Sequence, residues 1–321
     1  MATSCVTMLP TLPVVPLLVY RGPKEQGRDG VRVFLATLGC PKNVVDSECM
    51  ASLLARAGHQ IVESPARADV IIVNTCGFIE PAREESIAAL RELGQGKRRN
   101  QMLVAAGCLS QLWGARLAET VPAVDALIGT RRWAEIDALV ETLARRSARR
   151  GPPATLLGDP PEPDSTPEAG RPLTSASAYL KIADGCSAPC AFCTIPAIKG
   201  PYRSRPPAEI VREAPALEWL RIMYAYPQQI SPRLIQVMAT HDQVCRYLDL
   251  PLQHGHPDVL RRMRRPHDVD RVLEQIDGLR AAMPDVALRT SLIVGYPGET
   301  EAEFEALLQF LERIAFDRVG A

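Results

Sequence analysis

The chain has 321 residues, of which 46% are apolar, so it can bury a core and, at roughly 150 residues per domain, form two domains. Its 37 Lys and Arg residues balance 37 Asp and Glu residues, and zero net charge gives no strong signal for a nucleic-acid partner. Nine cysteines, an odd number without an evident secretion signal, argue against a disulfide scaffold and predict a reducing, cytoplasmic location.

Residues 1–28 are expected to form a flexible tail. Their apolar stretch is interrupted by Pro13 and Pro16 and is too short to span a bilayer, so no membrane association is expected. From residue 29 to 148, apolar segments alternate with amphipathic ones, which predicts an α/β domain with an open parallel sheet covered by helices. Strands are expected at Val31–Leu38, Asp69–Val73, Met102–Ala106 and Val124–Ile128, and helices at Val44–Ala57, Ala82–Leu93, Ser110–Glu119 and Trp133–Ala148.

Residues 149–177 are predicted to be an interdomain linker, because the stretch from Gly151 to Ser177 holds seven prolines and shows no hydrophobic period. A second α/β domain is predicted over residues 178–321. Its strands are expected at Ala178–Ala183, Leu217–Met223, Tyr247–Leu250 and Ala287–Val294, and its helices at Ala208–Glu213, Pro232–Thr240, Val269–Met283 and Glu301–Ile314.

Three cysteines, Cys186, Cys190 and Cys193, follow the first strand of this domain in a C-x3-C-x2-C pattern. Three thiolates on one short loop can hold three irons of a 4Fe-4S cluster and leave the fourth iron open to a non-protein ligand. A structural zinc site would normally need a fourth Cys or His, and none lies close by in the sequence. The spacing therefore favours an iron-sulfur site over zinc or unrelated thiols.

Two further features of the second domain are candidates for cofactor binding. The segment SLIVGYPGE, Ser291–Glu299, predicts a strand and a turn in which Gly295 and Gly298 let the backbone approach a ligand closely. Gln253 and His254 follow a strand, where the active sites of α/β barrels lie, and the alternative is a hydrogen-bonded structural pair.

Basic side chains of this domain fit either a ligand or solvent. Lys199, Arg203 and Arg205 follow the cysteine loop and could bind a carboxylate of a cofactor or substrate, with a solvated surface as the alternative. A second basic run is interpreted as a solvated helix end. It consists of Arg261, Arg262, Arg264 and Arg265.

Cys40, Cys76 and Cys108 lie far apart in the sequence, but each is expected at the carboxyl end of a parallel strand and has a glycine neighbour. In an open α/β sheet these strand ends meet at the ligand crevice. Free cysteines are also common in protein cores, which is the alternative explanation. The repeated placement favours a second set of metal ligands.

Five segments of the chain resemble the methylthiotransferase family of radical S-adenosylmethionine (SAM) enzymes. They are LGCPKNVVDSE (Leu38–Glu48), NTCGFIEPAREESI (Asn74–Ile87), GCLSQ (Gly107–Gln111), YLKIADGCSAPCAFCTIPAIKGPYRSR (Tyr179–Arg205) and LPLQH (Leu250–His254). The RimO-type branch, which modifies a ribosomal protein, is the best match. The tRNA-modifying branch typically has GCQMN and NTCAVR where this chain has GCPKN and NTCGFI.

The resemblance implies a flavodoxin-like N-terminal domain followed by a partial radical SAM (β/α) barrel. The cysteines at 186, 190 and 193 would hold a 4Fe-4S cluster that gives an electron to SAM, and Phe192 would lie near the adenine of SAM unless it only packs the loop. The resulting 5'-deoxyadenosyl radical would remove a β-hydrogen that no side-chain base could take near neutral pH, so no catalytic side chain is predicted. The cysteines at 40, 76 and 108 would hold a second 4Fe-4S cluster that supplies sulfur.

The activity implied by the resemblance is methylthiolation of the β-carbon of an aspartate in small-subunit ribosomal protein S-twelve, on or near the ribosome. A second SAM would supply the methyl group, and a protein such as flavodoxin would supply electrons. Two alternatives stay open: a tRNA adenosine methylthiotransferase, and a non-catalytic relic that binds an iron-sulfur cluster or zinc.

Two departures from the family pattern concern the second domain. Compared with the family pattern, a strand-helix unit of roughly 30 residues or more is expected to be missing between Glu213 and Leu217, with Pro215 at the junction. The sequence ends at Ala321, where the family continues into a last barrel strand and a TRAM domain. We therefore expect a structurally compromised second domain and an impaired enzyme, and a normally folded first domain.

Overall fold

A computed structural model describes four ranges of the chain: residues 30–145, 152–159, 177–214 and 217–321. The chain divides into two compact units. The N-terminal unit comprises residues 1–187 and 194–214, and the C-terminal unit comprises residues 188–193 and 215–321. Among the described residues, no helix has both the length and the apolar character needed to cross a membrane.

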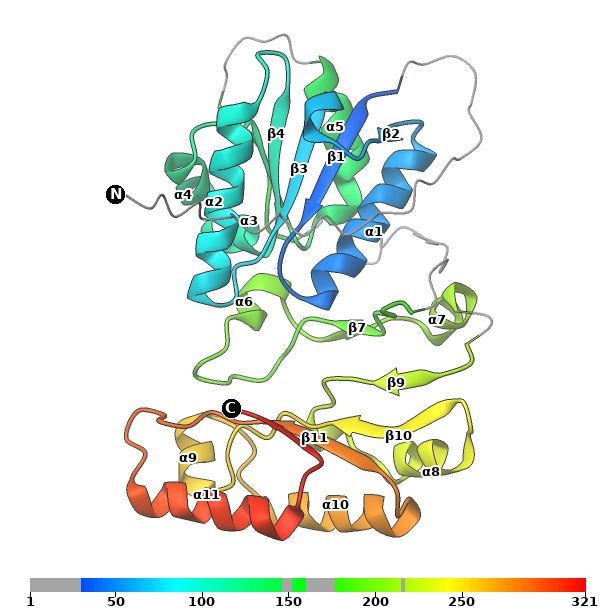
Figure 1. Cartoon of the computed structure of the whole chain (residues 1–321), viewed down its shortest axis with the longest axis vertical. Helices are drawn as coiled ribbons and strands as arrows, with labels where there is room; N and C mark the ends of the chain where they lie inside the picture. Colours follow the sequence, from blue (N-terminus) through cyan, green and yellow to red (C-terminus); the bar gives the residue numbers. More distant parts are fainter. Residues whose placement is uncertain (1–29, 146–151, 160–176, 215–216) are drawn as a thin grey trace, which may run out of the picture. The chain divides into compact units, whose positions relative to one another are not determined.

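A sheet of six strands, all paired in parallel, organises the N-terminal unit in the order β2-β1-β3-β4-β5-β6. Figure 1 labels four of them, β1 to β4. The strands are β1 (Arg32–Thr37), β2 (Gln60–Ile61), β3 (Val70–Thr75), β4 (Met102–Gly107), β5 (Ala126–Gly129) and β6 (Ala154–Leu156). The first five strands have the flavodoxin-like order, in which the direction of winding changes between β1 and β3. The predicted open parallel sheet is confirmed.

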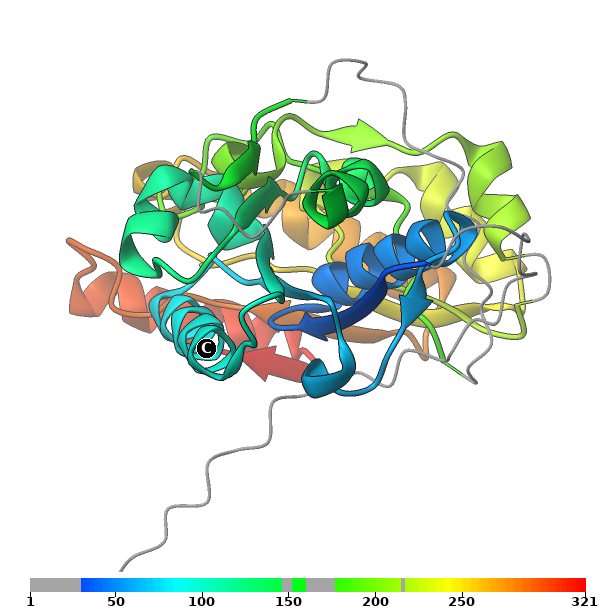
Figure 2. The ribbon, with the colours of Figure 1, turned by 90° about the horizontal axis from the view of Figure 1, so that it is seen from above.

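Alternate side chains of the buried strands face two separate cores. Val33 and Leu35 of β1 belong to the core under α1 and α5, whereas Phe34 and Ala36 belong to the core under α2, α3 and α4. The helices are α1 (Pro41–Arg56), α2 (Glu80–Gly96), α3 (Cys108–Trp113), α4 (Ala115–Thr120) and α5 (Ile136–Arg145), with short 3-10 turns at Pro65–Arg67 and Trp133–Glu135. In Figure 2, α1 (blue) and α2 (cyan) lie on opposite sides of β1. Burial on both faces explains why the strands are continuous apolar runs.

Two elements of this unit differ from the sequence prediction for local reasons. The predicted helix Ser110–Glu119 is divided into α3 and α4, because Gly114 between them has a φ of +51° and a ψ of −125°, outside the helical region. The predicted linker contains β6, which pairs with β5 at the sheet edge. Three strand residues are too few to produce a recognisable hydrophobic period.

The segment that carries the cysteine loop also differs from prediction. The strand predicted at Ala178–Ala183 is reduced to β7 (Ala183–Asp184), which pairs antiparallel with β8 (Arg203–Ser204). Two short helices accompany this pair, α6 (Ile195–Lys199) and α7 (Pro207–Glu213). The backbone there is held by the β7–β8 pair and by further backbone hydrogen bonds, such as the one from the N–H of Arg205 to the carbonyl oxygen of Ile182 at 2.9 Å.

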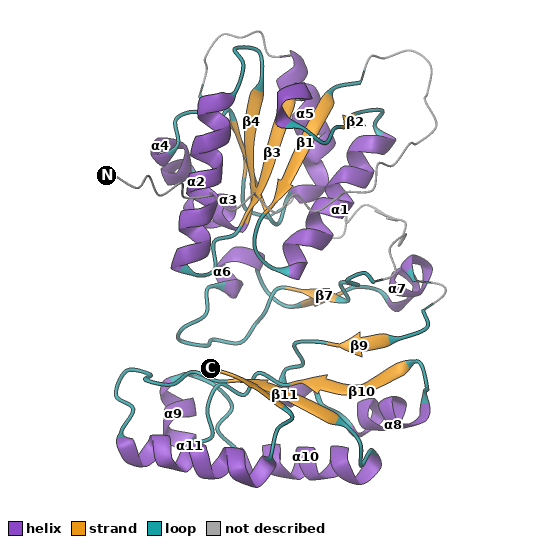
Figure 3. Cartoon of the chain, in the orientation of Figure 1, coloured by secondary structure: helices purple, strands orange, loops and turns teal. Residues whose placement is uncertain are grey.

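The C-terminal unit is built on four parallel strands in the order β12-β11-β10-β9. The strands are β9 (Leu220–Ile222), β10 (Val244–Asp249), β11 (Ala287–Ser291) and β12 (Arg318–Gly320). The helices are α8 (Pro232–Thr240), α9 (Pro257–Arg262), α10 (Val269–Ala282) and α11 (Glu301–Ile314), with a 3-10 turn at Pro227–Gln229. One core joins the strands to α8, α10 and α11, and Figure 3 shows α10 and α11 along one side of the strands. Helices on a single side of a parallel sheet agree with the predicted partial (β/α) barrel.

The limits of α11 are those predicted, and the sequence carries a strong signal at its start. Thr300 and Glu303 form a capping box at its start, in which each side chain bonds the backbone of the other residue. At its end Ala315 has a left-handed φ of +50°, which breaks the helical hydrogen bonding.

Strand β9 is joined to the sheet less regularly than its neighbours. It pairs with β10 at Leu220–Val244 and at Ile222–Leu248, and the register shifts between these two pairs. The predicted junction of the missing unit at Pro215 lies outside the described residues.

Candidate metal centres

Three strand-to-helix turns of the N-terminal sheet carry Cys40, Cys76 and Cys108. Cys40 directly precedes α1, Cys76 follows β3, and Cys108 is the first residue of α3 after β4. β1, β3 and β4 are neighbours, so their carboxyl ends meet at one edge of the sheet, where the winding direction changes. The topology thus brings together the three cysteines that the sequence singled out.

The backbones of these turns pack closely against one another at two glycines. Gly39 has a φ of +89°, and a Cβ built on it would lie 2.6 Å from the Cβ of Cys76. A Cβ on Gly77 would lie 3.0 Å from the Cα of Leu109, the residue after Cys108. A side chain at position 39 would therefore strain the backbone and displace Cys76.

Asn43, in the first turn of α1, is fully buried and connects the three turns. Its Nδ2 donates to the carbonyl oxygens of Leu38 (2.9 Å) and Thr75 (3.1 Å), and its Oδ1 accepts a weak hydrogen bond from the Sγ of Cys108 (3.5 Å). Sequence reasoning missed this residue. The available signal was an Asn three residues after Cys40, because Asn side chains in turns commonly bond nearby backbone.

Burial raises the pKa of two of these thiols. The pKa of Cys108 rises to about 12, chiefly because burial disfavours the thiolate, while the charge of Lys199 opposes the rise. Burial also raises the pKa of Cys76, and neighbouring Cys40 adds to that rise. Iron ligands must be thiolates, so metal binding here releases protons and becomes stronger as the pH increases.

A buried group of four charges, which we call the ion cluster, lies beside Cys108. Asp46 of α1 pairs with Lys181 and, at 2.7 Å, with Lys199, and Asp184 pairs with the same lysines at 3.2 and 3.5 Å. Burial lowers the pKa of Lys199, but Asp46 and Asp184 outweigh it and raise this pKa, so Lys199 stays charged. Two positive and two negative charges make the ion cluster neutral.

The alternative that Lys199 is a solvated surface charge is wrong. Its side chain is 3% exposed, and its Nζ also donates to the Oγ1 of Thr130 at 2.5 Å. Arg205 donates to the carbonyl oxygen of Lys181 at 2.7 Å and pairs with Glu213 at 2.6 Å. Both basic residues therefore hold the segment around the cysteine loop within the N-terminal unit.

The second cysteine set lies between β7 and α6, and its three thiols are half-buried: Cys186, Cys190 and Cys193. The backbone N–H of Cys186 donates to the carbonyl oxygen of Gly200 at 3.0 Å. The N–H of Cys193 donates to the carbonyl oxygen of Cys190 at 3.2 Å, which makes the end of the loop a tight turn. The loop is thus fixed by its backbone while its thiols remain partly accessible.

Buried oxygen atoms without partners lie beside both cysteine sets. Among the described residues, nothing bonds the Oγ of Ser110, two residues after Cys108, or the Oγ1 of Thr194, next to Cys193. Native proteins leave few such atoms unpaired. Hydroxyl groups can donate to sulfur, so both positions fit a cluster held by the adjacent cysteine.

The residues predicted beside SAM have open surroundings on the loop after β11 and on the cysteine loop. Gly295 and Gly298 have φ values of +71° and +82°, and a Cβ on Gly295 would meet no atom within 4 Å. Phe192 is 36% exposed, so its ring does not pack fully against the protein. These positions leave room for a ligand.

Gln253 and His254 lie at the carboxyl end of β10. Gln253 has a φ of +76°, and its N–H donates to the carbonyl oxygen of Ser291 at 2.9 Å. The Nδ1 of buried His254 accepts from the N–H of His256 at 2.9 Å, so its Nε2 carries the proton and donates to Glu299 at 3.2 Å. Burial lowers the pKa of His254, which keeps the ring neutral.

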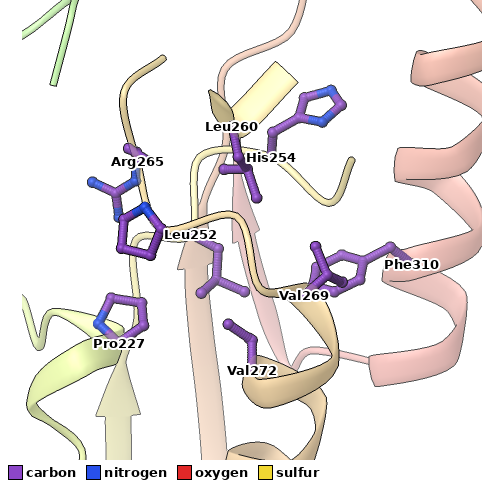
Figure 4. Close-up of a pocket in the computed structure, with 9 residues that line it drawn as sticks. Pro227, Leu252, His254, Leu260, Arg265, Val269, Val272 and Phe310 are labelled. Carbon is purple, nitrogen blue, oxygen red and sulfur yellow. The ribbon is translucent and has the colours of Figure 1, made fainter. Parts of the chain in front are cut away.

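A pocket of the C-terminal unit lies between these strand ends and the helices (Figure 4). Figure 4 shows Pro227 and Arg265 on one side and Phe310 on the other, with Leu252 between them. His254 also lines the pocket. Its walls are mainly apolar, and it is much smaller than a typical small-molecule site.

One potential cation site was not foreseen. Ligand atoms of His256, Asp258 and Glu303 all lie within 4.8 Å of one another. However, both carboxylate oxygens of Glu303 accept hydrogen bonds from Arg262, at 2.9 and 2.8 Å. These ion pairs explain the grouping. No set of cysteines in the described part of the chain forms a comparably close group, whereas thiolates around one zinc stand about 3.8 Å apart.

Comparisons with known proteins match both parts of the chain. Residues 32–129 match the uncharacterized protein family UPF0004, and residues 216–311 match the radical SAM superfamily. The chain is similar to proteins named ribosomal protein uS12 methylthiotransferase RimO from Roseiflexus castenholzii and Chloroflexus aurantiacus, with 45% identity to each. These alignments cover 90% and 91% of the chain and 73% and 75% of the two relatives.

The first alignment spans 353 positions, which is more than the 321 residues of the chain. Within the aligned region, the relative therefore has residues that the chain lacks. This agrees with the predicted missing unit. A solved structure of the cobalamin-dependent SAM radical enzyme OxsB, with aqua-cobalamin and SAM bound, is similar in fold. Its TM-score is 0.60 at 11% identity, over 89% of this chain and 52% of that chain.

Proposed function

Because the chain belongs to the RimO family of ribosomal protein uS12 methylthiotransferases, we propose that it attaches a methylthio group to the β-carbon of an aspartate of uS12, the S-twelve protein. The chain is a radical SAM transferase by its family and superfamily matches. The observation that carries the proposal is the presence of two separate cysteine triads, one on a short loop and one at three converging strand ends. Radical formation and sulfur supply each need a site of their own.

We propose that Cys186, Cys190 and Cys193 hold a 4Fe-4S cluster whose fourth iron is open to SAM. Such a cluster with SAM supplies one-electron chemistry that can remove an unactivated hydrogen from carbon. Half-buried thiols and the unpaired hydroxyl of Thr194 support this site. The exposed ring of Phe192, the open backbone at Gly295 and Gly298, and Gln253 at the strand end would bind SAM.

The second proposed site consists of Cys40, Cys76 and Cys108, which would hold a 4Fe-4S cluster as the sulfur source. Asn43 bonds the Cys108 thiol, and burial of two of the thiols would keep water away from a sulfur bound there. A second SAM would supply the methyl group. The three cysteines lie beside glycines at the point where the sheet changes its winding direction, which is where α/β folds bind ligands.

The remaining partners follow from this chemistry. The substrate is ribosomal protein uS12, on or near the ribosome, and one-electron reduction requires a donor such as flavodoxin. A reducing cytoplasm keeps the ligand thiols free. The missing unit beside β9 is expected to lower turnover relative to longer relatives, because β9 holds its register only weakly.

Anaerobic reconstitution with iron and sulfide tests the two sites. About eight irons per chain are expected for two 4Fe-4S clusters. About four irons per chain would contradict a cluster at the second site. Tightly bound zinc without iron would contradict both proposed clusters.

Mass spectrometry tests the substrate. The chain is expressed in cells that lack their own uS12 methylthiotransferase, and uS12 and tRNA are analysed from the same culture. A methylthio group on uS12 is expected. Methylthiolated adenosine in tRNA with unmodified uS12 would overturn the substrate proposal.

A further inference from the structure

Arg265, which lines the pocket, is a buried cation, and none of the described residues gives it an acidic partner. It belongs to the basic run that the sequence suggested was a solvated helix end, and that prediction is wrong for this residue because it is only 8% exposed. Arg261 and Arg262 pair with Asp258 and Glu303, but no carboxylate among the described residues pairs with Arg265. Buried charges are normally paired, so this guanidinium requires an anion from elsewhere.

The contacts of Arg265 direct one of its N–H groups toward a cluster ligand. Nη1 donates to the Sγ of Cys190 at 3.6 Å, and Nη2 donates to the carbonyl oxygen of Pro251 at 2.7 Å. The guanidinium carbon also lies 5.0 Å from the centre of the Tyr226 ring, within cation-π range. The guanidinium is therefore oriented before any metal binds.

The backbone around Arg265 holds the same loop. The N–H of Arg265 bonds the carbonyl oxygen of Leu260 at 2.9 Å, which closes the turn after α9. The carbonyl oxygen of Met263 in this turn accepts from the N–H of Ala191, next to Cys190, at 3.0 Å. One turn thus fixes both the loop backbone and the charge beside the thiol.

We propose that Arg265 is a positioning residue that raises the reduction potential of the cluster held by Cys186, Cys190 and Cys193, through its hydrogen bond and charge at the Cys190 sulfur. This rests on the proposed function, which places a cluster there. Reduction adds one negative charge to the cluster, and a nearby cation stabilises the reduced form more than the oxidised form. Hydrogen bonds to cluster sulfurs and local charge are known determinants of such potentials.

The test is an EPR-monitored redox titration of the reconstituted full chain, without SAM, in a Cys76→Ala background that leaves a single cluster. Arg265→Gln is compared with Arg264→Gln, which removes the same charge from an exposed neighbour at a φ of +54°. We expect Arg265→Gln to shift the ratio of reduced to oxidised cluster at a fixed potential by about tenfold, which is about 59 mV toward negative values. Arg264→Gln should leave it unchanged.

A purely structural role would lower the iron content of Arg265→Gln without moving the potential of the cluster that remains. That result, or an equal shift in both variants, would overturn the proposal. If Arg265→Gln takes up no iron, Arg265→Lys is titrated instead, because it keeps the charge but loses the fork that bonds the Cys190 sulfur. A smaller negative shift supports the proposal, and an unmoved potential refutes the part assigned to the Cys190 hydrogen bond. A background protein that itself shows no cluster signal would instead contradict the proposed function.

Discussion

The two cysteine sets use opposite means to place three thiols. The N-terminal set takes one residue from each of three turns, so its geometry depends on the whole parallel sheet. The loop set takes three residues from eight consecutive positions, so a few backbone bonds and one turn define it. Cys76 and Cys108 of the first set are buried, whereas all thiols of the second are half-buried.

This difference fits a division of roles. A site that stores reactive sulfur benefits from burial, because burial excludes water and competing thiols. A site that binds SAM must stay open on one side, which a loop permits. The same difference predicts that the sheet site responds to changes throughout its unit, while the loop site responds mainly to local ones.

The largest expected effect separates the two sites completely. Cys190→Ala should abolish one cluster and all reductive SAM cleavage, because no spare thiolate lies on the loop. Cys76→Ala should lose the other cluster but still produce 5'-deoxyadenosine, measured by liquid chromatography. Loss of that product in Cys76→Ala with the loop cluster intact would show that the sites do not divide the work.

A change in the ion cluster should affect the whole N-terminal unit. Asp46→Asn leaves Lys181 and Lys199 with one carboxylate, and removing one partner of a buried ion pair costs roughly 3–5 kcal/mol. The control Glu141→Gln breaks the exposed pair with Arg145 and should cost about 0.3–0.5 kcal/mol. Urea unfolding measures both free energies, and equal small losses would contradict the structural importance of the ion cluster.

Glycine substitutions should distinguish a packed site from an open one. Alanine at either Gly39 or Gly295 must adopt a left-handed backbone, at a cost of about 1–2 kcal/mol. Only Gly39→Ala also overlaps Cys76, a proposed iron ligand, so only this variant should lose iron from the N-terminal set. Iron analysis of both variants is the measurement, and a Gly39→Ala protein with full iron would show that the turn adjusts.

The smallest expected effect is on the pH dependence of iron uptake. The raised pKa values of Cys76 and Cys108 mean that these thiols are protonated at neutral pH, so proton release opposes metal binding. In a Cys190→Ala background, iron occupancy under limiting iron should increase between pH 7 and pH 9. Occupancy that is flat or falling over this range would contradict thiol deprotonation at the N-terminal set.

The regular elements could be predicted because their signals are local. α8 and α11 have the predicted limits. The buried strands of the first sheet are continuous apolar runs, and such runs predict strands directly from the sequence. The sequence did not predict β6, and it predicted a longer strand where β7 lies. Elements of two or three residues depend on contacts made by distant segments, which the local sequence does not show.

The two cysteine triads proposed as metal sites can be picked out from the sequence, because cysteine spacing and strand ends are visible there, whereas the residues that contact them cannot. The positions of Asn43 and Arg265 depend on contacts with Cys108 and Cys190, 65 and 75 residues away. A basic run gives no sign of which arginine turns inward, since burial is decided by the fold of the following turn.

The ion cluster also has a consequence for a cut chain. Asp46 lies before the proline-rich region, whereas Lys181, Asp184 and Lys199 lie after it. A protease that cuts between Leu156 and Ser177 would therefore leave two fragments held together by buried charges, which migrate separately in denaturing gels but elute as one species from a sizing column. The same two fragments, expressed from separate genes, should reassemble into a working pair, while the first fragment alone would expose an unneutralised carboxylate.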